Sequence, residues 1–480
     1  MLFNSFDFAI FLPIVFIIYW FLLYKNLKLQ NAFILLASYI FYGWWDWRFL
    51  LLIAFSTFTD FLFGILICYQ NDKKRKKLFL ALSLLVNLGI LGYFKYFNFF
   101  VENFIATFTF FGYSLEGEYV DVILPVGISF YTFQTLSYSI DIYRNKLTPT
   151  RNFIEFAAYV SFFPQLVAGP IERATNLLPQ FQSKRAFNPI QASNGLRQIL
   201  WGLVKKIMIA DNCARIVNPI FESPEAYNGS TLLLGAILFA FQIYGDFSGY
   251  SDIAIGTARL FGFNLMQNFA FPYFSRDIGE FWRRWHISLS TWFRDYVYIP
   301  LGGSKFGKLT TVRNTLAIFL VSGFWHGANW TFIIWGFLHA ILFLPLILLK
   351  HHRHHLDVVA GQRALPTLLE VFFILLNFIL VCLLWVIFRA ESLSDAVVYL
   401  QKIFTESLFQ PIMVEPYELF VLLSIFITLE WIGRKDQFGI ETFLVDRPWF
   451  VRWPFYHVLI VSIYLFGNFG TKYEFIYFQF

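Results

Sequence analysis

Apolar stretches alternate with short polar or basic stretches along most of this chain, and their spacing predicts membrane-spanning helices. A helix needs about 20 mostly apolar residues to cross ~30 Å of hydrocarbon. With allowance for tilt and for apolar pieces in the centre, the pattern predicts an all-α integral membrane protein with about eleven transmembrane helices. The regular runs lie at 8–23, 31–43, 49–69, 78–94, 315–328, 331–349, 368–388, 417–433 and 455–470.

The middle of the chain departs from this pattern. Residues 122–140 and 153–170 are apolar but rich in Pro, Gly, Ser and Gln, and residues 264–313 mix polar with aromatic side chains. Residues 196–218 carry basic side chains at helical intervals, which favours a helix lying at the membrane interface. Such irregular or polar segments are tolerated at membrane depth only where they line a cavity or are buried in protein. The centre is therefore where we expect the functional part of the molecule.

Composition and charge agree with a membrane protein. Hydrophobic residues make up 58% of the chain and charged residues 14%, whereas a soluble domain carries roughly a quarter charged residues. The net charge of +6 gives no signal for nucleic-acid binding, because basic residues of membrane proteins collect in cytoplasmic loops. The clusters NDKKRKK (71–77) and KHHRHH (350–355) are expected on that side. Three widely spaced cysteines predict neither a disulfide framework nor a metal site.

A histidine stands inside the apolar stretch GFWHGANW. An ionisable residue within a membrane is costly and usually functional. Gly323 and Gly327 would let backbone or a ligand approach His326 closely, and Trp325 would wall a tunnel. A neutral imidazole is the usual general base near pH 7. The alternative is a structural histidine bonded to a neighbouring carbonyl, and the local sequence leaves both interpretations open.

A second histidine lies in GEFWRRWHISLSTWFRDYVYIPLGGSK, among arginines and aromatic residues. Arg283 and Arg284 beside His286 suit an anionic group such as a pyrophosphate. The alternative is a cationic anchor with a tryptophan belt at the membrane surface. His339 is a third histidine in an apolar segment.

The stretch FQIYGDFSGYSDIAIG combines carboxylates with closely spaced glycines. Asp246 and Asp252 are six residues apart and do not share a helical face, so they do not predict a carboxylate pair. Gly245 and Gly249 form a GxxxG motif, which makes close helix packing the alternative to a functional site.

Asp60, inside the third apolar run, is expected to be a hydrogen-bonded carboxylate. From the residues alone, an enzyme acting within the membrane and a transporter both fit.

Several long motifs decide between these classes. The segments SFFPQLVAGPIER, FQIYGDFSGYSDIAIG, EFWRRWHISLSTWFRDYVYIPLGG and GFWHGANWTFIIWGFLHA follow one another in this order. Together with the opening MLFNSFDFAIFLPIVFIIYW, they resemble the membrane-bound O-acyltransferase family, in particular its bacterial alginate O-acetyltransferase-like branch. The resemblance covers nearly the whole chain. It implies a single polytopic domain over 1–480, with N-terminal spans in 1–100, a central catalytic region in 120–345 and C-terminal spans in 365–480.

The resemblance also implies a fold and a set of site residues. The transmembrane helices would ring a thin centre of re-entrant and interfacial helices pierced by a tunnel. His326 matches the essential histidine of the family's WHG motif, and His286 matches a second catalytic position. His339 matches a further histidine of the branch with a less defined role. Trp325 and Asp246 are expected to support the site.

The activity implied is O-acetylation of an exported polysaccharide in the bacterial cytoplasmic (inner) membrane, with lipid around a multi-pass protein. Acetyl-CoA would be the donor, no cofactor would be bound permanently, and an extracytoplasmic acetyltransferase or esterase-like partner is expected. The donor's phosphates are expected near Arg283, Arg284, Lys205 and Lys206. The alternatives are D-alanyl transfer to teichoic acid and O-acetylation of peptidoglycan. A transporter of a glycan precursor is a more distant alternative.

Overall fold

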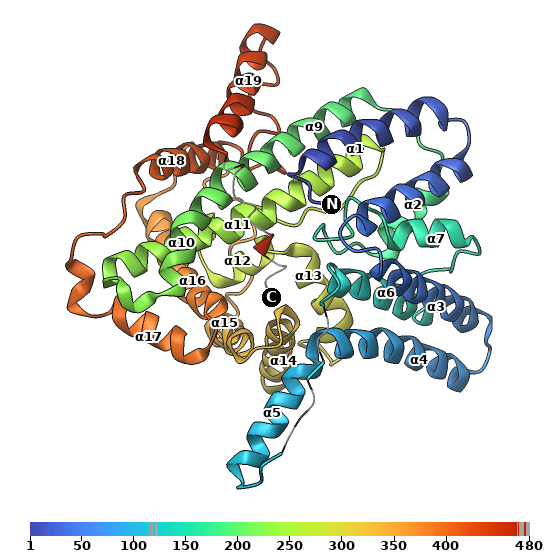
Figure 1. Ribbon diagram of the computed structural model, residues 1–480, viewed down its shortest axis with the longest axis horizontal. Coiled ribbons are helices and arrows are strands. Elements are labelled where there is room, and N and C mark those ends of the chain that lie inside the picture. The colour runs from blue at the N-terminus through green and yellow to red at the C-terminus, as the bar shows by residue number, and fades with distance from the viewer. Residues whose placement is uncertain (116, 118, 121–122, 468, 470–474, 477–480) are drawn as a thin grey trace. The chain divides into compact units, whose positions relative to one another are not determined.

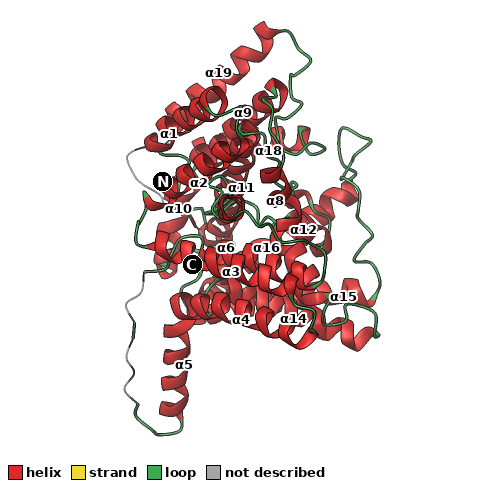
Figure 2. Ribbon diagram, turned by 90° about the vertical axis from the view of Figure 1, so that its right-hand side faces the viewer, coloured by secondary structure: helices red, strands yellow, loops and turns green. Residues whose placement is uncertain are grey.

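The protein was analysed as a computed structural model, which describes residues 1–115, 117, 119–120, 123–467, 469 and 475–476. Across these residues the secondary structure is helical, without a strand (Figure 2), which confirms the all-α prediction. A helix satisfies its own backbone hydrogen bonds, as a segment in hydrocarbon must. Six described helices are long and apolar enough to cross a membrane, and the larger count of eleven stays a prediction. They are Phe49–Tyr69, Lys73–Phe110, Gly229–Leu260, Trp330–Leu348, Leu368–Arg389 and Trp449–Phe466.

The chain divides into two compact units. The first comprises Met1–Gly195 and Thr257–Met266, and the second comprises Leu196–Gly256 and Gln267–Phe480. The first unit contains α1 (Phe6–Ile17), η1 (Ile18–Leu22), α2 (Leu27–Gly43), α3 (Phe49–Tyr69), α4 (Lys73–Leu91), η2 (Gly92–Tyr96), α5 (Phe97–Phe110), α6 (Ile128–Tyr143), α7 (Phe153–Val160) and α8 (Ala174–Gln182). Two helices, α9 (Pro189–Leu203) and α11 (Gly229–Leu260), have residues in both units.

The second unit contains the remaining elements, and every candidate site residue belongs to it. Its described elements are η3 (Val204–Ala210), α10 (Asp211–Glu222), η4 (Pro224–Ala226), η5 (Pro272–Phe274), α12 (Ile278–Arg284), α13 (Ile287–Phe293), η6 (Arg294–Tyr298), α14 (Lys308–His326), α15 (Trp330–Leu348), α16 (Leu368–Arg389), α17 (Leu393–Ile403), η7 (Glu406–Phe409), α18 (Tyr417–Ile432) and α19 (Trp449–Phe466).

Helices α3, α4 and α6 of the first unit lie side by side (Figure 1), and a buried carboxylate joins them. Asp60 on α3 is fully buried and accepts hydrogen bonds from Ser83 Oγ at 2.7 Å and Asn87 Nδ2 at 2.9 Å, both on α4. Ser139 Oγ on α6 lies 3.5 Å from the same carboxylate oxygen. The prediction of a hydrogen-bonded carboxylate is therefore confirmed, as expected for a polar group that cannot reach water.

Helices α14 and α15 of the second unit form a tight antiparallel pair. A Cβ atom on Gly323 would collide with the carbonyl oxygen of Phe332, and one on Gly336 would collide with the carbonyl oxygen of Phe319. The two glycines thus allow the helix backbones to touch. Each helix carries a histidine one turn after its glycine, and because the helices are antiparallel, His326 and His339 lie on opposite sides of the crossing.

The GxxxG motif of α11 serves helix packing. A Cβ atom on Gly249 would lie 2.8 Å from the carbonyl oxygen of Gly202 on α9, and one on Gly245 would lie 2.9 Å from that of Lys205. The alternative of close packing is therefore confirmed. The partner segment η3 is a π-helical turn whose seven residues are all buried. The basic side chains of this turn are therefore buried in protein, and its location at the membrane interface stays a prediction.

Candidate active site

His326 occupies the C-terminal end of α14, where an aromatic layer surrounds it. The side chain is buried. Its ring lies 5.3 Å from the indole of Trp335 on α15, at an interplanar angle of 90°, and 5.4 Å from the ring of Phe388 on α16. Trp325, its chain neighbour, is half-buried. An imidazole in such surroundings is shielded from bulk water, which strengthens any electrostatic interaction that it makes.

His339 on α15 belongs to the same aromatic layer. Its ring lies 4.7 Å from Trp335, which therefore contacts both histidines. Trp282 on α12 donates its indole N–H to His339 Nδ1 at 3.2 Å. The structure thus brings together His326 and His339, which the sequence singled out separately.

His286 lies between the short helices α12 and α13, with its backbone in the left-handed region at φ +44°. Such a conformation is uncommon for a residue with a Cβ atom and persists only where the surroundings enforce it. The ring packs edge-on against Phe247 of α11 at 4.7 Å. Asp246, expected to support the site, directly precedes this phenylalanine. Burial, together with the nearby His326, lowers the pKa of His286 well below its usual range, so the ring is neutral at pH 7.

Asn268 holds His286 in place, although no sequence motif predicts this role. Its Oδ1 atom lies 3.1 Å from His286 Nδ1 and also accepts a hydrogen bond from Ser288 Oγ at 2.8 Å. The backbone N–H of Ser288, which can only donate, lies 3.3 Å from Oδ1 and identifies it as the acceptor, while Nδ2 donates to Ser251 Oγ at 3.1 Å. His286 Nδ1 must therefore carry the proton, and Nε2 of the neutral ring carries the lone pair. Asn268 is 18 residues away in sequence and belongs to no recognised motif, so only the folded chain reveals the contact.

Replacing Asn268 with aspartate is expected to make activity depend on pH. A carboxylate facing Nδ1 favours the imidazolium form of His286 and raises its pKa. Wild-type activity should be flat between about pH 6 and pH 8, whereas Asn268→Asp should lose activity as the pH falls through the raised pKa. The measurement is the pH–rate profile of acyl transfer. Gln267→Glu, which adds the same charge one residue away, serves as the control and should stay flat; equal profiles for all three proteins would refute the role of Asn268.

A cavity of about 470 Å³ opens beside this layer. Its wall includes three arginines, Arg283, Arg294 and Arg353, together with Trp282. Ser322 also lines it and lies one turn before His326 on α14. The cavity thus joins cationic groups to the aromatic layer, an arrangement suited to a ligand with an anionic part and a less polar part.

The two paired arginines of the sequence have different surroundings. Arg283 lines the cavity, and its guanidinium donates to the carbonyl oxygens of His352 at 2.6 Å and His355 at 2.7 Å. The basic cluster 350–355 is therefore docked at this end of the unit. Arg284 instead bonds the carboxylate of Glu280 and the carbonyl oxygen of Asp357. The guanidinium N–H groups of Arg284 are therefore already hydrogen-bonded within the protein.

Lys205 and Lys206, expected near the donor's phosphates, are buried in ion pairs. Lys205 Nζ lies 3.1 Å from Asp252 and 3.3 Å from Glu430. Lys206 Nζ lies 2.9 Å from Asp211 and 2.7 Å from Asp246. The consecutive lysines thus hold separate carboxylates, and the prediction that Asp246 and Asp252 are not a pair is confirmed. The positive charges of Lys205 and Lys206 are neutralised by these carboxylates, so neither lysine is placed to attract a phosphate.

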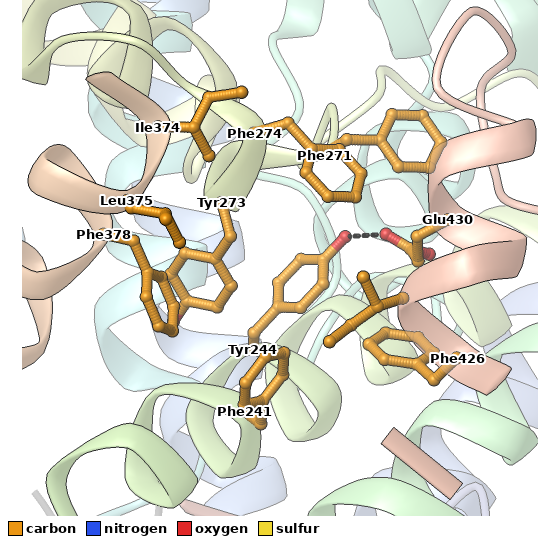
Figure 3. A pocket seen from close by; sticks show the side chains of 11 residues that line it. Phe241, Tyr244, Phe271, Tyr273, Phe274, Ile374, Leu375, Phe378, Phe426 and Glu430 are labelled. Atoms are coloured by element: carbon orange, nitrogen blue, oxygen red, sulfur yellow. Dashed lines mark hydrogen bonds between the residues drawn. The ribbon is translucent and has the colours of Figure 1, made fainter. Parts of the chain in front are cut away.

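A second, smaller cavity of about 170 Å³ borders the Lys205 network (Figure 3). Aromatic and aliphatic side chains of α11, α16 and α18 line it. The Tyr244 hydroxyl donates to Glu430 Oε2 at 2.6 Å within this wall, as the dashed line in Figure 3 marks. Glu430 Oε1 accepts from Trp201 Nε1 at 3.0 Å. Both carboxylate oxygens are therefore engaged by the protein itself.

Comparison with known proteins finds relatives over most of this chain. Residues 40–388, which include all three histidines, match the sequence model of the membrane-bound O-acyltransferase family. A probable alginate O-acetylase of Pseudomonas aeruginosa is 41% identical over 398 residues, which cover 82% of this chain and 73% of the relative. A peptidoglycan O-acetyltransferase of Helicobacter pylori is 36% identical over 426 residues, which cover 82% of this chain and 78% of the relative.

A more distant similarity covers less of the chain. A teichoic acid D-alanyltransferase of Streptococcus thermophilus is 30% identical over 231 residues, which cover 45% of this chain and 55% of the relative. These relatives share acyl transfer but differ in the group moved and in its acceptor. Because the family match spans most of the chain and the helices are apolar enough to span a membrane, this protein belongs to the membrane-bound O-acyltransferase family and is a multi-pass membrane acyltransferase.

Proposed function

We propose that this acyltransferase moves an acetyl group from cytoplasmic acetyl-CoA across the bacterial inner membrane, for O-acetylation of an exported, alginate-like polysaccharide. The observation that carries the proposal is the buried layer of His326, Trp335 and His339 next to an arginine-lined cavity. Two O-acetylating relatives that each align with 82% of the chain support acetyl as the group moved. The D-alanyl alternative rests on a match to 45% of the chain.

The arginine-lined cavity is the proposed donor site. Arg283, Arg294 and Arg353 would hold the phosphates of acetyl-CoA, since guanidinium groups bind phosphate oxygens in a bidentate manner. Arg353 lies in the basic cluster that the sequence predicts on the cytoplasmic side, where this donor is available. The thioester would extend past Trp282 and Ser322 toward His326. The proposed donor site does not include Arg284, Lys205 or Lys206.

The proposed reaction is a direct acyl transfer. His326 takes the proton of an acceptor hydroxyl while the hydroxyl oxygen attacks the acetyl carbonyl carbon. The carbon–sulfur bond then breaks, and the imidazolium of His326 returns the proton to the leaving thiolate. His286, neutral and fixed by Asn268, would orient the acyl group or stabilise the developing oxyanion.

The proposed acceptor is an exported polysaccharide, and two arguments support it: the locations of donor and acceptor, and the names of the relatives. A donor that stays in the cytoplasm and an acceptor that is exported would have to meet within the membrane, which would call for a base at that depth. An extracytoplasmic acetyltransferase or esterase-like protein would pass the acetyl group to the final sugar. O-Acetylation of peptidoglycan is a second candidate, favoured by the 36% identity to the Helicobacter pylori enzyme.

The test is the ester-linked acetate content of exported polysaccharide and of peptidoglycan in the native strain, a deletion strain and the complemented deletion. The proposal expects acetate on the exported polysaccharide to disappear in the deletion and to return on complementation. Loss from peptidoglycan alone would favour the second candidate. Unchanged acetate in both polymers, with loss of D-alanyl esters, would overturn the assignment of acetyl transfer.

A further inference from the structure

Two buried N–H groups that α15 contributes to the aromatic layer have no hydrogen-bond acceptor among the residues that the structure describes. One is the indole Nε1 of Trp335, and the other is Nε2 of His339. Trp335 is 1% exposed and His339 is 0% exposed, so bulk water does not satisfy either group. Buried polar groups are nearly always paired, and an exception calls for a physical explanation.

The contact with Trp282 determines which nitrogen of His339 carries the proton. An indole N–H can only donate, so His339 Nδ1, at 3.2 Å from Trp282 Nε1, must accept with its lone pair. The proton of the neutral ring is then on Nε2. An imidazolium would place two N–H groups opposite each other at Nδ1, so the same contact disfavours the charged ring. Nε2 of His339 is therefore a buried donor.

One donor belongs to the ring that contacts the proposed base, and the other belongs to a ring that contacts the first donor's ring. The Trp335 ring is 5.3 Å from the ring of His326 and 4.7 Å from that of His339, so the three rings form one continuous cluster. The glycine crossing of α14 and α15 fixes their relative positions, because the two backbones are in contact there. An oxygen atom held among these rings would lie in a dry environment that contains two N–H groups without an acceptor.

We propose that Trp335 Nε1–H and His339 Nε2–H form the oxyanion hole of this acyltransferase. The inference rests on the proposed acetyl transfer. As the acceptor oxygen forms its bond to the acetyl carbon, the carbonyl π electrons move onto the carbonyl oxygen, and the two N–H groups bind the resulting anion. When the carbonyl re-forms, the thiolate leaves and takes the proton held by His326. Fixed donors aimed at developing charge in a water-excluded site stabilise it without reorganisation.

This assignment separates the roles of the three histidines. His326 moves the proton, and His339 donates to the oxyanion as a neutral ring. His286 then orients the acyl group, and the oxyanion does not depend on it. Trp335 is then a catalytic residue, although tryptophan is not a residue type from which a sequence would predict this role.

The experiment follows thiol release from acetyl-CoA in membrane vesicles of the complemented deletion strain, normalised to the amount of protein. Trp335→Phe and His339→Leu should each lower kcat by about 10²–10³-fold while KM for acetyl-CoA changes by less than about threefold. His339→Gln, which retains an N–H near the position of Nε2, should recover at least about tenfold over His339→Leu. Phe281→Leu, which disturbs packing against Trp282 and His339 but removes no donor, should retain most of the wild-type kcat.

Each outcome decides the inference. A kcat near the wild-type value in Trp335→Phe and His339→Leu, with His326→Ala inactive, would overturn the oxyanion hole and leave the proposed function standing. Equal losses in His339→Gln, His339→Leu and Phe281→Leu would likewise overturn it, since packing would then explain the effect. A wild-type protein that releases no thiol from acetyl-CoA would overturn the proposed donor, and the inference with it.

Discussion

Replacing His326 with alanine is expected to lower acyl transfer by about 10²–10⁴-fold, the range that a general acid–base group contributes. The side chain is 5% exposed and touches Trp335 and Phe388, so water would not readily take over its role as a base. The loss should appear in kcat, because nothing in the proposed reaction makes this imidazole a binding group for the donor's phosphates. The measurement is the rate of thiol release from acetyl-CoA in vesicles with matched protein levels.

The matched control is His457→Ala. His457 is exposed on α19, and its Nδ1 lies 2.7 Å from the carbonyl oxygen of Trp453, one turn away. Its removal should leave kcat unchanged. His326→Ala with a wild-type rate would remove this residue from the mechanism, even if the deletion strain loses its acetate esters.

The largest effect on stability is expected from Lys205→Met. The ammonium group lies between Asp252 and Glu430, and all three side chains are at most 10% exposed. Removing it leaves two carboxylates buried without their cation, and breaking a buried ion pair in this way typically costs about 3–5 kcal/mol. The free energy of unfolding, measured by denaturant titration in detergent micelles, should fall by about that amount.

A compensating variant separates charge from packing. Changing Asp252 to Asn and Glu430 to Gln in the Lys205→Met background removes both buried charges and should restore much of the lost stability, since an uncharged polar group costs less to bury than an ion. Lys308→Met, at an exposed position, should change the free energy of unfolding by less than about 0.5 kcal/mol. A Lys205→Met protein as stable as Lys308→Met would show that the network is not essential to the fold.

Several features of the molecule were predictable from local sequence. Apolar runs and Gly-x-x-x-Gly spacing depend on one helix at a time, and both α3 and the packing of α11 agree with them. Asp60 was expected to be hydrogen-bonded, because burying a carboxylate without partners is too costly for a stable protein. His326 and His339 stood out because ionisable side chains are rare in apolar segments.

Other features required the folded chain. Basic residues at helical intervals predicted an interfacial helix at 196–218, yet Lys205 and Lys206 are buried, since their carboxylate partners come from α10, α11 and α18. The helical spacing of basic residues shows where the charges lie along one helix. It does not identify a partner such as Glu430, which is 225 positions after Lys205. The same limit applies to Asn268, whose contact with His286 depends on the path of the chain between α11 and α13.

The sequence by itself determined that this is a helical membrane protein with histidines in apolar surroundings, because hydrophobicity and residue type are local properties. Only the tertiary structure decided the proton positions on two of those rings. Asn268 makes Nδ1 the donor in His286, whereas Trp282 makes Nδ1 the acceptor in His339. A neutral imidazole takes the tautomer that its hydrogen-bond partner requires, and the partner is chosen by packing between elements.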